Sequence, residues 1–316
     1  MMRKSCISVL LLFSVLMISY SSTNDSLSAS RKVQILNNHT FIPADVDFSP
    51  FTNTNLRMRV GVAQTEELEY LAIKVGDYQL VSLSGKIFFS SMNLHYQQRV
   101  KDWLALYVDL DFTARIGVEF STLFAEGVNT VNHFNVGWLI RLWHTEKHLL
   151  SSYFNLSNYN ASFVNLKNAF EGLKNDTLIA VSEKVPALIG ALGMRYYYVP
   201  SDLLGIGAIA ELDYGESLRR GEQTIFYILG AKVDLDLYGR TNIPLGFALH
   251  YYVSSNPSFI QVENDEAQIL GFRIAYTGGN DFMIGFGGSM GLLPVESKDN
   301  PIRAYFGNIE LNYYFR

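Results

Sequence analysis

Three stretches of the sequence carry residue types that could do chemistry. His144 to His148 reads His-Thr-Glu-Lys-His, but this is not the spacing of a metalloprotease helix, so a solvated charge cluster in a loop is the preferred interpretation over a metal site. His250, followed by Ser254 and Ser255, supplies a base and a hydroxyl for a lipid hydrolase of the Ser-His-acid type. That hypothesis is weakened because His250 falls on the polar face of its predicted strand, whereas lipid hydrolysis needs the base on the lipid side.

The third stretch, Gly285 to Gly291, is rich in glycine like a phosphate-binding loop. No Lys-Ser or Lys-Thr pair follows it, and it lies inside an alternating strand, where glycines leave space or permit bending. The sequence therefore predicts no cofactor and no metal site, and it keeps an enzyme only as a minor alternative.

Charged side chains recur on the polar face of the predicted strands. Because both signs are present throughout, the first interpretation is a network of ion pairs that fills a narrow interior. The second is a constriction that selects solutes by charge. The candidate lumen-lining residues are Arg57, Arg59, Asp109, Asp111, Arg115, Glu119, Arg195, Glu211, Asp213, Lys232, Asp234, Asp236, Arg273 and Glu310.

Alternation of apolar and polar residues predicts the strands that position these charges. It is clearest from Trp103 to Phe120, where one face is apolar throughout and the other carries Asp109, Asp111 and Arg115. Side chains at positions i and i+2 share one face of a strand, whereas a helix would place these charges among the apolar residues. The segment is therefore predicted as a strand.

The same pattern predicts an all-β fold, a transmembrane antiparallel up-and-down β-barrel of about twelve strands over residues 56–316. In the second half of the chain the connections alternate between short and long, as they do in such barrels. A turn at Ser84-Gly85 would divide the third strand, and a fourteen-stranded version that uses Thr177 to Lys184 stays open. The expected strands are 56–64, 68–75, 78–97, 103–120, 134–143, 187–199, 203–215, 224–238, 243–253, 268–276, 282–292 and 302–315.

Composition favours a membrane barrel over a soluble sandwich. Aromatic residues make up 14% of the chain and charged residues 17%, against roughly 25% charged residues in a soluble domain. The polar faces are rich in Gly and Ala, and aromatic residues gather at strand ends, where they suit the membrane interface. Since no basic run is present, nucleic acid is excluded as a partner.

The N-terminus predicts an exported protein. Residues 1–22 carry Arg3 and Lys4 ahead of a short apolar stretch, as a secretory signal peptide does, and cleavage sites after Ser22 and after Ser30 are both open. Cys6 lies within this segment, so the mature chain is expected to have no cysteine. Residues 23–55 show no sustained periodicity and are predicted as a mobile leader.

The longest expected connection runs from His144 to Pro186. Phe163, Leu166 and Phe170, followed by Leu173, recur at helical spacing. They predict a short amphipathic helix in this loop, either folded into the mouth of the barrel as a plug or capping its rim.

The final strand places Gly307, Ile309, Leu311, Tyr313 and Phe315 on one face. Here the chain resembles the bacterial outer-membrane β-barrel proteins, whose last strand ends in alternating apolar residues and a terminal aromatic that serves as an assembly signal, although Arg316 follows the aromatic here. The whole chain is also similar to Bacteroidetes-type barrels of unassigned function. The resemblance implies an outer-membrane location in a Gram-negative bacterium after signal-peptide cleavage, with membrane lipid and the barrel assembly machinery as partners.

Three functions stand as hypotheses. The leading one is a passive channel or transporter for small solutes or small apolar molecules. The second is a structural or adhesive barrel with a closed lumen that acts through its external loops, and the third is a barrel lipid hydrolase or acyltransferase.

Overall fold

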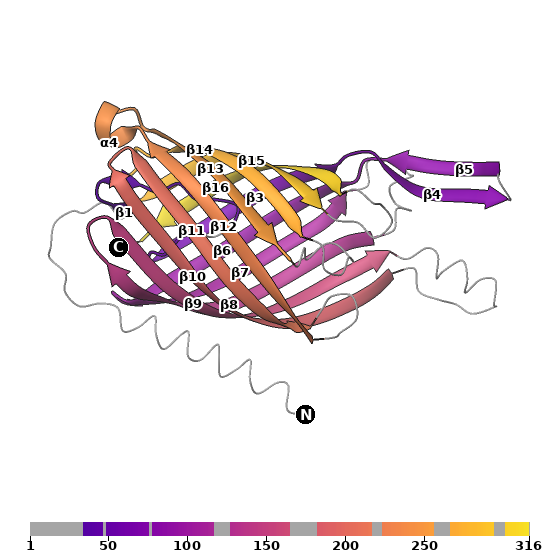
Figure 1. The fold of residues 1–316 in the computed structure, drawn as a ribbon, viewed down its shortest axis with the longest axis horizontal. Coiled ribbons are helices and arrows are strands. Elements are labelled where there is room, and N and C mark those ends of the chain that lie inside the picture. Colours follow the sequence, from indigo (N-terminus) through magenta and orange to yellow (C-terminus); the bar gives the residue numbers. More distant parts are fainter. Residues whose placement is uncertain are drawn as a thin grey trace, which may run out of the picture. The chain divides into compact units, whose positions relative to one another are not determined.

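The fold is known from a computed structural model (Figure 1). It describes residues 34–46, 49–75, 78–116, 127–164, 182–216, 223–255, 266–293 and 301–315. The predicted signal peptide lies outside these residues.

Twelve antiparallel strands form one closed barrel. The first barrel strand, β3, pairs with the last, β16, which closes the sheet, and neighbours in the sheet are otherwise consecutive barrel strands. The all-β barrel and its twelve strands are confirmed, and the fourteen-stranded version is wrong. The strands are β3 (Asn55–Thr65), β6 (Phe88–Lys101), β7 (Leu104–Ile116), β8 (Gly127–His144), β9 (His148–Val164), β10 (Ser182–Ser201), β11 (Leu204–Glu216), β12 (Gln223–Asp236), β13 (Leu245–Ser254), β14 (Ala267–Tyr276), β15 (Phe282–Leu293) and β16 (Ile302–Tyr314).

Two of the expected strands are wrong in detail around residues 68–97. β4 (Leu68–Val75) and β5 (Tyr78–Gly85) pair only with each other, in a separate hairpin that projects beyond one rim of the barrel (Figure 1). β5 ends at Gly85 and β6 begins at Phe88, so the divided version of the 78–97 strand is the right one. Alternation marks a strand but does not identify its partner, which is why a hairpin outside the barrel was counted as part of the wall.

The predicted long connection from His144 to Pro186 is also wrong. Residues 148–164 form β9, and β10 begins at Ser182; the stretch between them lies outside the described residues, and with it most of the expected helix. β9 escaped detection because its outward face carries Ser152 and Asn158 beside Phe154, which interrupts the apolar alternation. Within the described part of the chain the one helix is the short α4 (Tyr238–Thr241), between β12 and β13.

The two ends of the barrel differ. At one end, which we call the tight-turn end, short connections join β6 to β7, β8 to β9, β10 to β11, β12 to β13 and β14 to β15. At the other, the loop end, the remaining connections include the β4–β5 hairpin. No helix among the described residues is long and apolar enough to cross a membrane.

The outer face of the barrel is apolar and exposed. Leu212 is 62% exposed, Phe272 54% and Ile309 54%, and their neighbours on the same face are similar. A water-soluble protein rarely leaves so extensive an apolar surface uncovered, whereas hydrocarbon wets it at no cost. Aromatic residues such as Tyr214 and Tyr276 lie near strand ends, where the membrane interface would be.

Candidate functional site: a plugged lumen and its vestibule

The chain segment that precedes β3 lies inside the barrel. Its described residues, 34–46 and 49–54, contact inward side chains of strands on both sides of the wall, and Phe41 and Ile42 are fully buried. We call these residues the plug. They belong to the segment predicted as a mobile leader, and the structure instead packs them against the wall, because the lumen removes their apolar side chains from water.

The plug begins with a small hairpin of β1 (Ile35–Leu36) and β2 (His39–Thr40). The two connecting residues, Asn37 and Asn38, have φ angles of 48° and 62°. Asparagine enters this left-handed region more readily than other residues with a side chain, and a two-residue hairpin turn needs two such positions in succession. The Asn-Asn pair therefore accounts for the reversal of the chain here.

Apolar side chains of the plug fit against aromatic and glycine positions of the wall. The ring of Phe41 stacks on that of Tyr197 in β10, with centroids 3.8 Å apart. A Cβ atom at Gly205 would collide with Phe41, and one at Gly246 would collide with Ile42. The glycines that the sequence shows on the polar face thus leave space for the plug.

One charged cluster at the centre of the lumen joins the plug to three strands. Asp45 of the plug lies 2.9 Å from Arg273 Nη2 and 3.2 Å from His250 Nε2, and it accepts a hydrogen bond of 3.0 Å from Asn308 Nδ2. Arg273 also pairs with Glu310 at 2.6 Å, and the Arg273 and Glu310 side chains are 0% and 1% exposed. This burial makes the pairing essential, since an unpaired charge would be costly here.

Arg59 of β3 completes the cluster. It lies 2.7 Å from Glu310 Oε2 and donates to the backbone carbonyls of Ala44 (2.7 Å) and Asp45 (2.6 Å). Two guanidinium groups therefore face two carboxylates, and we call Asp45, Arg59, Arg273 and Glu310 the central quartet. Its charges balance, as buried charges must.

Other wall side chains donate mainly to backbone carbonyls of the plug. These bonds satisfy polar groups that a buried chain without sheet partners would otherwise leave unmet. They are Arg195 to Ser49 (3.2 Å), Ser151 to Pro50 (2.6 Å), Gln97 to Phe51 and Asn53 (2.8 and 2.7 Å) and Lys232 to Ile42, while Asp236 accepts from the Thr40 N–H (3.0 Å).

His39 fixes the plug at the tight-turn end. Its Nδ1 lies 3.1 Å from the carbonyl of Asp202, in the β10–β11 connection, and therefore donates to it. Burial lowers the pKa of His39 to about 4, so the ring is neutral at neutral pH. A neutral ring suits its edge-to-face contact with Phe41.

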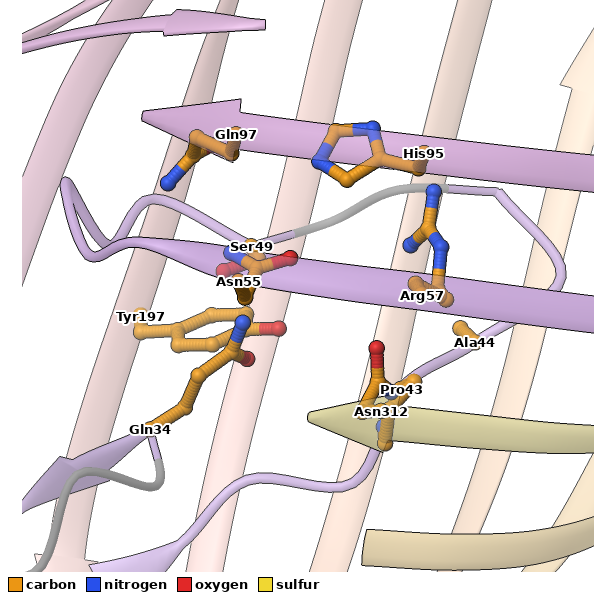
Figure 2. Close-up of a pocket in the computed structure, with 10 residues that line it drawn as sticks. All are labelled: Gln34, Pro43, Ala44, Ser49, Asn55, Arg57, His95, Gln97, Tyr197 and Asn312. Atoms are coloured by element: carbon orange, nitrogen blue, oxygen red, sulfur yellow. The ribbon is translucent and has the colours of Figure 1, made fainter. Parts of the chain in front are cut away.

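Little space remains between the plug and the wall. Figure 2 shows Pro43, Ala44 and Ser49 of the plug beside Arg57 of β3 and the surrounding wall residues. The gap that these residues line measures about 10 Å³, roughly the space of one water molecule. This gap has no room for a larger solute.

A larger cavity lies beside the plug, and we call it the vestibule. It measures about 210 Å³ and is lined by β3 and β6 to β11, with Asp45 and Val46 of the plug as part of its floor. Its wall is mostly charged, amide and hydroxyl side chains, including Asp109, Asp111 and Asn135. The vestibule is therefore a polar compartment on the β3 to β11 side of the barrel.

Strand register organises the vestibule wall into two rows. One row crosses five strands as Arg59, Asn93, Asp111, His133 and Tyr159. Directly opposite residues in a sheet have adjacent side chains, so each carboxylate lies between two polar neighbours. The second row is Arg57, His95, Asp109, Asn135 and Ser157.

Within these rows the carboxylates hold their neighbours by hydrogen bonds. Asp111 accepts from Asn93 Nδ2 at 2.6 Å and lies 3.0 Å from His133 Nδ1. Asp109 lies 2.5 Å from His95 Nδ1 and 3.3 Å from Asn135 Nδ2. The His133 ring stacks on Tyr159 with centroids 4.1 Å apart.

The structure divides the predicted lumen-lining residues between the two regions. Arg115 is half-buried on β7, and Glu119 lies outside the described residues. Around the plug lie Arg59, Lys232, Asp234, Asp236, Arg273 and Glu310; around the vestibule lie Arg57, Asp109, Asp111, Arg195, Glu211 and Asp213.

Sequence reasoning missed Asp45, which lies in the predicted leader, and the lumenal roles of His95 and Asn135. Parity along β6 and β8 could have placed the last two on the inner face. For Asp45 the available signal was the apolar run around Phe41 and Ile42, which is too apolar for a chain that stays in water.

The structure also shows where the three stretches with candidate chemical residues lie. His144 to His148 spans the exposed β8–β9 connection, and no metal-binding cluster of His, Cys, Asp or Glu occurs among the described residues. His250 points into the lumen towards Asp45, away from the outer face of the barrel. The glycine-rich stretch lies within β15.

The C-terminal residues proposed as an assembly signal lie along β16 and just beyond it. Ile309, Leu311, Tyr313 and Phe315 are all exposed on the outer face, as that role would need, and a side chain at Gly307 would meet open space. The role itself stays a prediction.

No family model matches the chain, and no curated protein matches it. Among solved structures, a NanC porin is similar, with 9% identity, a TM-score of 0.48 and coverage of 82% of this chain and all of that one. So is the translocator domain of the autotransporter NalP from Neisseria meningitidis (12%, 0.43, 83% and 89%). A FadL homologue from Pseudomonas aeruginosa is a third (9%, 0.44, 84% and 91%). These neighbours are bacterial outer-membrane β-barrels.

Proposed function

We propose that this chain is an outer-membrane channel that is closed by its own N-terminal plug and that passes small polar solutes when the plug withdraws. The tight-turn end faces the periplasm in this proposal, since barrels of this kind have short periplasmic turns and longer external loops. The vestibule then opens towards the external side.

The observation that carries the proposal is how the plug is held. Its described hydrogen bonds to the wall up to Asn53 run through side chains, and its only backbone pairing is within its own hairpin. The plug can therefore leave the lumen without breaking any backbone hydrogen bonds between the strands of the barrel. A permanent core would be expected to join the sheet or to fill the whole lumen.

The vestibule supports a polar rather than an apolar cargo. Its wall presents carboxylates, guanidinium groups and amides, and an apolar solute would have to desolvate them without replacing their hydrogen bonds. This favours small polar solutes over the small apolar molecules that the sequence left open.

The test is a conductance comparison in planar bilayers between the mature protein and a variant that lacks residues 34–52. We expect the mature protein to be mostly silent and the variant to give steady open steps. Heat-modifiable migration on gels checks that both are folded barrels. A folded variant that is as silent as the parent would contradict the channel and favour the structural barrel with a closed lumen.

A further inference from the structure

Several hydrogen-bond acceptors in the wall of the vestibule have no partner among the described residues. Asn135 is only 8% exposed, and its Oδ1 atom has no hydrogen-bond partner among the described residues. The amide cannot be turned to remedy this, because its Nδ2 faces Asp109. A buried acceptor left unmet costs free energy, so the site is built to receive a donor.

Three further acceptors in the wall of the same cavity also have no hydrogen-bond partner among the described residues. Asn93 directs its Nδ2 to Asp111, which leaves Oδ1 without a partner in the described structure. His133 directs Nδ1 to Asp111, so its unpartnered Nε2 is an acceptor when the ring is neutral. Asp213 Oδ1 is the third. Four unmet acceptors in one cavity are unusual, since buried polar groups nearly always find partners.

The charge of the wall points the same way. Outside the balanced central quartet, the described wall holds four carboxyl groups (Asp109, Asp111, Glu211 and Asp213) and two guanidinium groups (Arg57 and Arg195). Glu211 and Asp213 are hydrogen-bonded to each other and therefore share a proton, which leaves three negative charges against two positive ones. Negative groups therefore outnumber guanidinium groups in this wall. A neutral compound with hydroxyl groups would donate hydrogen bonds to the acceptors but would leave the negative charge uncompensated.

We propose that the vestibule is a binding site for a small organic cation, a primary amine whose N–H groups donate to Asn135, Asp111 and Asp213. An ammonium group has three donors and no acceptor, which matches a wall with unmet acceptors and excess negative charge. The His133–Tyr159 stack borders the cavity and offers apolar area to the carbon chain of the amine. The inference rests on the proposed function in that the conduit would deliver the cation.

Three four-carbon probes of similar shape test the proposal: 1,4-diaminobutane, 1,4-butanediol and succinate. They are titrated calorimetrically into the folded, detergent-solubilised protein at pH 8. We expect binding of the diamine alone, weakening as salt is added. Asp111→Asn and Asp213→Asn should each weaken it by about tenfold or more, because hydrogen bonds to charged groups are the stronger kind.

Glu146→Gln, in the exposed β8–β9 connection, is the matched control and should leave the affinity unchanged. Equal binding of the diol or of succinate, an equal loss in the control variant, or no binding of any probe would overturn the proposal. Because binding is measured on the closed barrel, its outcome is independent of conductance. A protein that conducts but does not bind the diamine would refute this site alone, and one that binds but never conducts would refute the channel alone.

Discussion

The two regions of the lumen use the same kinds of residue in opposite ways. Around the plug, Arg59, Arg273 and Glu310 are closely paired with each other and with Asp45, and the charges balance. Around the vestibule, Asp111 and Asp213 face a cavity, and several acceptors beside them have no described partner. The side chains of both regions lie on the inner face of their strands. The difference between the regions is therefore what each part of the wall faces. One wall is completed by the chain's own N-terminal segment, and the other is open to a ligand.

The largest expected effect comes from breaking the paired side. Arg273→Leu leaves Asp45 and Glu310 without their shared cation, and Glu310 is 1% exposed. Removing one partner of a buried pair costs about 3–5 kcal/mol, and we expect a loss of stability of that order. Urea titration followed by heat-modifiable migration measures it.

Asp111→Asn is the matched substitution on the vestibule side. Asp111 is 39% exposed in its side chain, so the change should alter stability by less than about 1 kcal/mol. Equal losses in the two variants would show that the regions do not differ as described.

A second prediction concerns the fit of the plug. Gly246→Val places side-chain atoms where Ile42 now packs, so the plug should be displaced and open steps should appear in planar bilayers. Gly307→Ala is the control, because a Cβ there meets nothing within 4 Å. Conductance from both variants, or from neither, would count against the described contact.

The smallest effect is expected at the β4–β5 hairpin. Replacing residues 68–85 with a short glycine-serine turn should leave the midpoint of the heat-induced migration change where it was, since the hairpin shares no ladder with the barrel. A large fall in that midpoint would show that the hairpin supports the wall.

The sequence predicted the barrel and its inner face because side-chain parity in a strand is a local property. It predicted the number twelve through two errors that cancelled: the strand at 68–75 belongs to the outer hairpin, and β9 was missed. Pairing is a tertiary property. Ser152 and Asn158 interrupt the apolar residues on the outer face of β9, so its alternation could not be recognised.

The candidate site was predictable only in part. Parity placed Asp111 and Arg273 on the inner face, but nothing local distinguishes a charge that meets the plug from one that faces the vestibule. Asp45 lies in a segment without periodicity, and its partners Arg273 and Asn308 are more than two hundred residues away in the chain. Such contacts depend on the closure of the barrel, which no local pattern encodes.

The central claim is that the plug is a removable gate. The predicted mature chain has no cysteine, so the pair Ile42→Cys and Gly246→Cys can be introduced alone; the Cγ1 of Ile42 lies 3.1 Å from the position of a Cβ at Gly246, close enough for a disulfide. Single-channel recording should find the oxidised double variant fully silent, and adding a reductant should restore the rare open steps expected of the mature protein. Steps of the same size and frequency before and after reduction would contradict the account.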